Sequence, residues 1–201
     1  MALRSMHLEE FAGLFVLVLV VLVSAYYYDH SERRYARGRR AHASVGSFRL
    51  AYGYMRITTI VAGTLAFVTE SPLLLDIHDD NVLLFVGMVI ALAGLTLFVV
   101  SKRRLGAAYS PCYDAHLPGM IVSDGPYRFV RHPIYTGNFL VLFGLFAMTG
   151  SVWILLNAIL LAMYAARSAR LEERALESAL PGYRSYRNAT GRFVPRLGPR
   201  R

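Results

Sequence analysis

The sequence predicts an all-α, polytopic integral membrane protein with about five transmembrane helices, and three observations support this. First, 55% of the 201 residues are hydrophobic and 17% are charged, whereas a soluble domain is about 45–50% apolar and about 25% charged. Second, the apolar residues are gathered in long runs. Third, the basic residues lie between and after these runs, so the net charge of +9 indicates membrane topology and not nucleic-acid binding.

Three apolar runs in the first half are long enough to cross a bilayer, which takes about 20 residues within a range of about 17–25. Residues 11–28 end in three consecutive tyrosines, which are typical of an interfacial aromatic belt. Residues 50–69 form a weaker candidate because Arg56 lies inside the run. Residues 81–100 contain no charged residue and form the third candidate.

Two shorter apolar runs follow, at residues 134–149 and 151–166, with Gly150 between them. Each run is a little short for a span, and together they are too long for one. A tight helical hairpin over 134–170 explains both, with Gly150 supplying the turn. The count of predicted spans is therefore about five.

Charge alternates in phase with these spans. The segment between the first two spans holds six arginines, residues 70–80 hold four acidic residues and no basic one, and nine arginines follow from Arg167 onward. The positive-inside rule then predicts an outside N-terminus and a cytoplasmic C-terminus. A cleaved signal peptide ending at residues 23–25 is the alternative, but it would export the arginine-rich segment. The single Cys112 excludes an internal disulfide and a cysteine-cluster metal site.

The stretch "GPYRFVRHPIYTG" at residues 125–137 carries polar chemistry beside an apolar run. Pro133 suits the first turn of a helix and biases His132 toward an extended conformation, so the fourth span begins at about Pro133. The unpaired N–H groups of that first turn favour an anion. Gly125 marks a turn upstream, and Gly137 thins the first helical turn for close approach.

The hairpin brings a distant segment to the same place. If the returning helix continues one turn beyond the apolar run, Glu172 and Glu173 emerge at the end that holds Arg131 and His132. Carboxylates, arginines, a histidine and tyrosines then converge at one cytoplasmic interface. Each group taken alone also suits a membrane interface or a solvated helix face, and it is their coincidence that predicts a site.

These blocks, together with "EERAL", "GYRSY" and "GRFVP", resemble the isoprenylcysteine carboxyl methyltransferase family and its relatives, the membrane phospholipid methyltransferases. The resemblance covers about residues 119–195. It suggests a division into transmembrane helices over 1–110 and a catalytic region over 111–201. It implies S-adenosyl-L-methionine as cofactor, held in a cytoplasmic pocket closed by the C-terminal segment, and a lipid or hydrophobic small molecule that enters from the bilayer.

Site residues follow from the resemblance by position. The catalytic candidates are Arg131, His132, Glu173 and Arg170. The cofactor-binding candidates are His116, Gly119, Met120, Ile121, Val122, Gly125, Tyr127, His132, Pro133, Ile134, Tyr135, Gly137, Glu172 and Glu173. One departure concerns a histidine that the family often has three residues before the valine preceding the turn. Counting back from Val122 reaches Gly119, and the nearest histidine is His116, so this part of the cofactor contact is expected to be rearranged.

The residue chemistry agrees with methyl transfer. Carboxylates suit a ligand that carries a sulfonium and an ammonium, while Arg131 and the helix N-terminus suit a carboxylate. A carboxylate acceptor needs no general base, whereas an amine acceptor, as in phospholipid N-methylation, needs one such as His132 or a glutamate. Two other functions stay open: an NADPH-dependent membrane reductase of the sterol-reductase type, which two carboxylates suit poorly, and a non-enzymatic lipid-binding membrane protein.

Overall fold

The computed structural model describes residues 8–34, 46–69, 82–109 and 120–196, and the structural statements below concern this part of the chain. Every named element in it is a helix, which confirms the predicted all-α class. The elements are α1 (Leu8–Arg34), α2 (Gly46–Val68), α3 (Val82–Leu105), η1 (Gly106–Ala108), η2 (Gly125–Arg128), α4 (Pro133–Thr149), α5 (Val152–Ala179) and α6 (Tyr183–Ala189). The predictions for Cys112, His116 and Gly119 fall outside the described residues.

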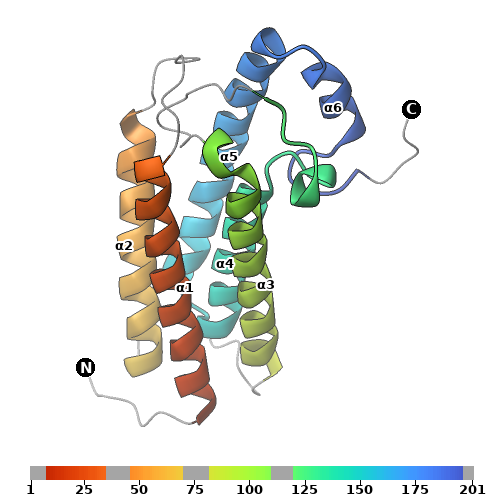
Figure 1. Cartoon of the computed structure of the whole chain (residues 1–201). Coiled ribbons are helices and arrows are strands. Elements are labelled where there is room, and N and C mark those ends of the chain that lie inside the picture. The colour runs from red at the N-terminus through yellow and green to blue at the C-terminus, as the bar shows by residue number, and fades with distance from the viewer. Residues whose placement is uncertain (1–7, 35–45, 70–81, 110–119, 197–201) are drawn as a thin grey trace.

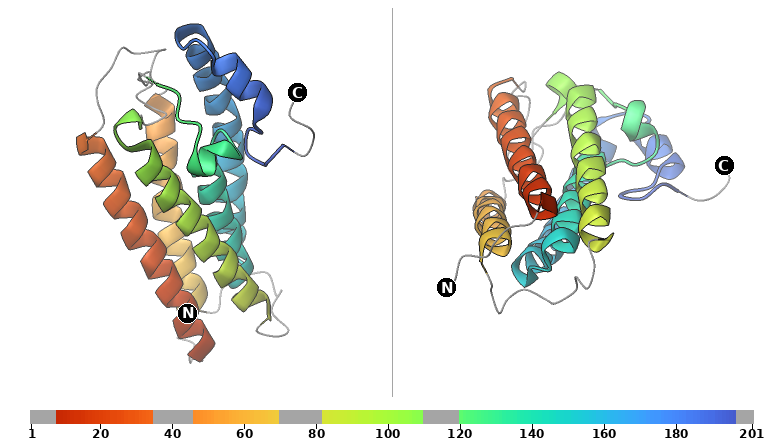
Figure 2. Two further views of the ribbon diagram at one scale, coloured as in Figure 1. Left: turned by 45° about the vertical axis from the view of Figure 1, so that its right-hand side comes forward. Right: turned by 90° about the horizontal axis from the view of Figure 1, so that it is seen from below.

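The long helices α1 to α5 lie side by side and alternate in direction (Figure 1). The C-terminal ends of α1, α3 and α5 and the N-terminal ends of α2 and α4 therefore share one end of the bundle, where η2 and α6 also lie (Figure 2). We call this the site end. The basic residues at 102–104 lie in the last turn of α3, and those at 128 and 131 precede α4, so they belong to the site end as well.

Two of the described helices, α3 and α5, are long and apolar enough to cross a membrane. Shorter apolar stretches occur at Phe11–Tyr27 in α1 and over the whole of α4 (Pro133–Thr149). These lengths suit a bilayer core that is about 30 Å thick, since a helix rises about 1.5 Å per residue.

Helices α3 and α4 are packed along a seam of glycines. A Cβ atom at Gly94 would lie 2.7 Å from the carbonyl oxygen of Gly137, and one at Gly144 would lie 2.6 Å from that of Gly87. Only glycine permits backbones to approach so closely, and small residues are the usual contacts between membrane helices. Gly137, which we predicted to thin the first helical turn for close approach, lies against the α3 backbone at Gly94 and Phe98.

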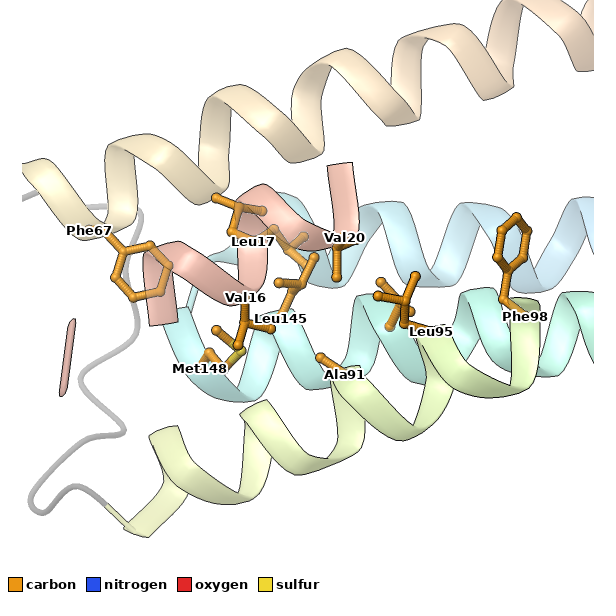
Figure 3. Packing of buried hydrophobic residues seen from close by; sticks show 11 residues of the cluster. Val16, Leu17, Val20, Phe67, Ala91, Leu95, Phe98, Leu145 and Met148 are labelled. Atoms are coloured by element: carbon orange, nitrogen blue, oxygen red, sulfur yellow. The ribbon is translucent and has the colours of Figure 1, made fainter. Parts of the chain in front are cut away.

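The apolar core extends from this seam toward α1 and α2. Val16, Leu17, Leu95, Leu145 and Ile154 are among its buried residues, and Figure 3 shows the labelled members between the helices. Phe98 lies at the end of this row on α3. The turn of α3 that follows Phe98 carries the first basic residues of the site end.

A buried polar contact joins α2 to α5. The Nδ2 atom of Asn157 donates hydrogen bonds of 2.9 Å to the hydroxyl oxygens of Thr58 and Thr59, and Asn157 is buried. Hydrogen bonds of this kind across membrane helices contribute on the order of 1 kcal/mol. This contact fixes α2 against the hairpin that carries the site.

The predicted hairpin is present. Pro133 is the first residue of α4, and Gly150 ends that helix in the left-handed region at φ 64°. Helix α5 begins at Val152 and runs to Ala179, well beyond the apolar residues that end at 166. The charged part of α5 therefore returns to the site end and carries Glu172 and Glu173 with it.

Candidate functional site

The beginning of α4 is shaped by the turn before it. Gly125 has φ 54°, a conformation that glycine adopts without strain, and it starts the short helix η2. The Tyr127 side chain is buried, and its hydroxyl lies 3.4 Å from the carbonyl oxygen of Ser101 on α3. Val130, Arg131 and His132 then lead into Pro133. His132 has φ −124° and ψ 58°, so it does not adopt the extended conformation that we predicted for the residue before proline.

Residues 130–132 pair with the C-terminal segment, residues 190–193. Val130 and Gly191 form a parallel bridge, and the N–H groups of Arg131 and His132 donate to the carbonyl oxygens of Gly191 and Arg192 at 2.9 and 3.1 Å. The hydroxyl of Thr136 in α4 donates to the carbonyl oxygen of Phe193 at 2.7 Å. The "GRFVP" block thus closes the site end by backbone pairing.

Glu173 is the centre of the polar contacts and is only 3% exposed. Its Oε1 atom accepts hydrogen bonds from Arg131 Nε at 2.9 Å and from Arg192 Nε at 3.0 Å, and it lies 3.1 Å from His132 Nε2. Its Oε2 atom accepts from Arg192 Nη2 at 2.7 Å. We call Arg131, His132, Glu173 and Arg192 the Glu173 cluster.

Electrostatics keep this carboxyl group ionised. Burial raises the pKa of Glu173, but hydrogen bonds from His132, Arg192 and Arg131 lower it by more, so that the pKa lies well below the ordinary value. Nearby phenols behave in the opposite way, since burial raises the pKa of Tyr127 and Tyr183 and raises that of Tyr186 to about 12. These tyrosines are therefore neutral hydrogen-bond donors at physiological pH.

Arg131 also holds the C-terminal segment through a second nitrogen of its guanidinium group, Nη1. Its Nη1 atom donates to the carbonyl oxygens of Arg187, at 2.8 Å, and of Thr190. The hydroxyl of Tyr186 donates to the carbonyl oxygen of Tyr127 at 2.7 Å. Helix α6 and the turn before α4 are therefore tied together by side chains as well as by backbone.

A cavity of about 130 Å³ lies beside the Glu173 cluster. Most of its wall comes from α3 and η1, from η2 and the segment before it, from the start of α4, and from α5 and α6, and α1 and α2 contribute Ser24 and Tyr52. The predicted site residues on its wall are Met120, Ile121, Val122, Tyr127, Arg131, His132, Ile134, Tyr135 and Glu172. The rings of His132, Tyr135 and Phe193 pack against one another with centroids 5.8 to 6.2 Å apart.

The two neighbouring glutamates have different positions. Glu173 is directed at Arg131, Arg192 and His132, whereas Glu172 lines the cavity and its side chain is 43% exposed. Glu172 Oε2 lies 3.8 Å from His132 Nδ1. The geometry thus makes Glu172 the carboxylate that a ligand can reach and Glu173 the one that holds the site together.

Other predicted residues lie off the cavity wall. Pro133 is fully buried at the start of α4. Gly125 supplies the turn, and Gly137 contacts α3. Arg170 is exposed on α5, one turn before the Glu173 cluster, so its predicted catalytic role remains a prediction without support from its position.

Sequence reasoning missed three residues of the site. Arg192 and Phe193 belong to the quoted "GRFVP" block, but a motif match does not reveal that they contact Glu173 and His132. Lys102 lies on the cavity wall, and in the sequence it looks like one of three positive-inside residues after a span. Among the described residues there is no group of three or more His, Cys, Asp or Glu side chains that could hold a metal ion.

Comparison with known proteins places these elements in context. The model of the phospholipid methyltransferase family matches residues 82–181, which run from the start of α3 through the end of α5. The chain is 40% identical over 105 residues to the cobalt-zinc-cadmium resistance protein CzcN of Cupriavidus metallidurans, an alignment that covers 51% of this chain and 49% of that protein.

A second relative is the nickel-cobalt-cadmium resistance protein NccN of Alcaligenes xylosoxydans xylosoxydans. It is 30% identical over 146 residues, which are 72% of this chain and 64% of that protein. The chain thus spans between about half and two thirds of the length of these two relatives.

Proposed function

Residues 82–181 belong to the phospholipid methyltransferase family, within the group of membrane methyltransferases that resemble the isoprenylcysteine carboxyl methyltransferases, and from this premise we propose the function of the chain. We propose that it is an integral-membrane methyltransferase that uses S-adenosyl-L-methionine and acts on a lipid-like or prenylated acceptor. One observation carries the proposal: the matched residues include most of the cavity wall and three of the four residues of the Glu173 cluster, namely Arg131, His132 and Glu173.

The proposed topology has five spans, with the site end in the cytoplasm. The alternating directions of α1 to α5 and the gathering of basic residues at the site end support it. Cysteine labelling can test it in a Cys112→Ser background. A cysteine at Ser185 in α6 should react only after the membrane is permeabilised, and one at Ser71 should react in intact cells. The opposite pattern would reverse the orientation.

The residues on the cavity wall fit the proposed cofactor. The Glu172 carboxylate suits an ammonium or a ribose hydroxyl, and the rings of Tyr127, Tyr135 and Tyr183 suit a sulfonium and an adenine face. S-adenosylmethionine, when bound, supplies an electrophilic methyl group on a positively charged sulfur. The chain's own contribution is then to orient the reactants and to exclude water, which suits an in-line displacement.

The acceptor that we favour is a carboxylate, as in isoprenylcysteine-type O-methylation. A carboxylate is already ionised at neutral pH, so the site needs no general base for it. For the second candidate, N-methylation of a phospholipid amine, a base must remove a proton. His132 would be that base, because it lies on the cavity wall between Glu172 and Glu173.

Binding calorimetry on the solubilised chain tests the proposal. Wild-type protein should bind S-adenosylmethionine and S-adenosylhomocysteine with micromolar affinity, and NADPH should have no effect in a parallel thermal-shift measurement. Binding of NADPH alone would favour a membrane reductase. A well-folded chain that binds none of the three would favour a non-enzymatic lipid-binding protein.

The names of the two relatives refer to resistance to metals. If this chain shares that role, we propose that it does so through methylation of a membrane component. Growth of a deletion strain in cobalt, zinc or cadmium, with rescue by wild type compared to rescue by Glu172→Gln, would test the connection.

A further inference from the structure

Lys102 stands apart from the basic residues beside it. Three consecutive basic residues end α3, and two of them, Arg103 and Arg104, are exposed and contact Tyr27 and Asp124. Lys102 is only 6% exposed and lines the site cavity. A residue that served only the positive-inside rule would extend its amine to water, as long basic side chains usually do.

Two aromatic rings hold the Lys102 amine in this position. Its Nζ atom lies 3.2 Å from the ring centroid of Tyr109 and 5.8 Å from that of Phe98. Such contacts stabilise a cation electrostatically. The C-terminal end of α3 adds a favourable dipole. Both rings also line the cavity, so the amine is fixed on the wall of a site where ligands are expected.

A second cavity of about 90 Å³ adjoins the first, because Ser24, Tyr52, Asn138 and Leu161 line both. Most of its other lining residues are apolar: Val20, Val21, Met55, Ile60, Val141, Leu142 and Leu145. This cavity lies among α1, α2, α4 and α5, toward the middle of the bundle. Together the two cavities present a polar end and an apolar end, which is the shape of an amphiphile.

The charges on the wall divide into two groups. Arg131 and His132, just before α4, are directed at Glu173 on α5, and Glu172 lies beside them. Lys102 comes from α3 and is not part of that cluster. The wall therefore offers a carboxylate on the α5 side, suited to the cofactor, and a cation on the α3 side.

We propose that Lys102 binds an oxyanion of the acceptor and selects amphiphiles that carry one, an inference that rests on the proposed function. An ammonium is a compact point charge with three N–H donors, which suits a carboxylate or a phosphate. The oxyanion is the reacting carboxylate if the acceptor is an acid, and the phosphate beside the amine if the acceptor is a phospholipid. Lys102 is then a specificity-determining residue on the α3 wall.

Eight-carbon amphiphiles that differ only in the polar group can test this. Octanoate, octyl phosphate, octylamine and octanol are titrated by calorimetry into the full chain in a non-ionic maltoside detergent. We expect the wild type to bind octanoate and octyl phosphate at least tenfold more tightly than octylamine and octanol. Whether octanoate or octyl phosphate binds with the higher affinity distinguishes a carboxylate site from a phosphate site.

Variants assign the preference to one residue. Lys102→Met should reduce the preference for oxyanions to less than threefold, and Lys102→Arg should keep most of it. Arg103→Met is the matched control, since Arg103 is the cation next to Lys102 in the chain and lies outside the cavity. Arg56→Met tests the cation on the wall of the second cavity. Arg103→Met should bind like wild type, and Arg56→Met should keep the preference for oxyanions whatever its effect on the affinity for all four amphiphiles.

Three results would overturn the inference: a wild type without a preference for oxyanions, a Lys102→Met variant that keeps it, or its loss in Arg56→Met. If Lys102→Met does not fold, Lys102→Gln and the wild-type series decide the question. Calorimetry with S-adenosylhomocysteine separates the two proposals. No binding by wild type refutes the methyltransferase function, whereas an equal loss of cofactor affinity in Lys102→Met would assign Lys102 to the cofactor and refute the inference.

Discussion

The Nε atom of Arg131 lies 2.9 Å from Oε1 of Glu173, although 42 residues separate them in the chain. The α4–α5 hairpin brings these two residues together, and Arg192 and the carbonyl oxygens of the C-terminal segment complete the contact. One buried carboxylate thus joins the start of α4, the end of α5 and the C-terminal segment.

Replacing Glu173 by Gln should destabilise the site end strongly. Gln keeps the shape but leaves Arg131 and Arg192 without a buried counter-charge, and breaking a buried ion pair costs about 3–5 kcal/mol. Thermal unfolding of the solubilised protein measures the loss. Glu177→Gln is the control, because that carboxylate pairs with Arg187 and Arg184 in a more exposed position and should cost about 1 kcal/mol or less. Equal effects of the two substitutions would contradict the central role of Glu173.

The same carboxylate predicts a pH dependence. Because the pKa of Glu173 is lower in the folded protein than its ordinary value of 4.5, its stabilising contribution is complete above that value and is lost as pH falls further. The difference in melting temperature between wild type and Glu173→Gln should therefore be constant from pH 7 to pH 5 and narrow below about pH 4.5. A difference that does not change with pH would mean that the charge is not what stabilises the fold.

Glu172→Gln should separate binding from stability. Glu172 lines the cavity without taking part in the hydrogen bonds of Glu173, so its loss should lower cofactor affinity by about tenfold, or ~1.4 kcal/mol. The melting temperature without ligand should change little. Calorimetry with S-adenosylhomocysteine gives the affinity, and Glu177→Gln should bind like wild type. Unchanged affinity in Glu172→Gln would remove this residue from the cofactor site.

Arg131→Lys tests whether the guanidinium geometry matters. The Nε and Nη1 atoms of Arg131 point at different partners, and lysine keeps the charge but cannot reach both. Expression and topology should stay intact while turnover falls by about tenfold or more, or ~1.4 kcal/mol per decade. The exposed Arg128 is the control, and Arg128→Lys should have wild-type turnover. A fully active Arg131→Lys variant would leave Arg131 as a membrane-interface charge.

The glycine seam predicts a contrast between two substitutions of the same kind. A Cβ atom at Gly144 would lie 2.5 Å from the backbone nitrogen of Ala91, whereas one at Gly53 meets nothing within 4 Å. Gly144→Ala should therefore cost about 1–3 kcal/mol through overpacking. Gly53→Ala should be neutral or stabilise α2 by up to about 1 kcal/mol. Melting temperatures in detergent measure both effects, and a tolerated alanine at Gly144 would mean that α3 and α4 can separate.

Much of the fold follows from the sequence because membrane helices are long and strongly apolar. The start of α4 at Pro133, the turn at Gly150 and the return of Glu172 and Glu173 to the site end were predicted from backbone chemistry and helix rise alone. These predictions depend on local rules and on one length comparison, so no knowledge of side-chain packing was needed.

The different roles of neighbouring residues could not be predicted in this way. Glu172 and Glu173 are adjacent and chemically identical, and only the rotation of α5 directs one to the cavity and the other to Arg131. Likewise, Lys102 differs from Arg103 and Arg104 only in the face of α3 on which it lies. The glycine seam was missed because the close approach at Gly137 could not be assigned to Gly94 until α3 and α4 are placed in contact.

The pairing of residues 130–132 with 191–192 bears on how the protein is made. Arg131 precedes its acceptor Thr190 by 59 residues, which at about 5–20 residues per second is about 3–12 seconds of translation. The C-terminal partners of Arg131 are therefore made after all the residues of α1 to α5. Until residues 187–192 are in place, the Glu173 carboxylate has only Arg131 and His132 as hydrogen-bond partners, so the site end is the last part of the described structure to be completed.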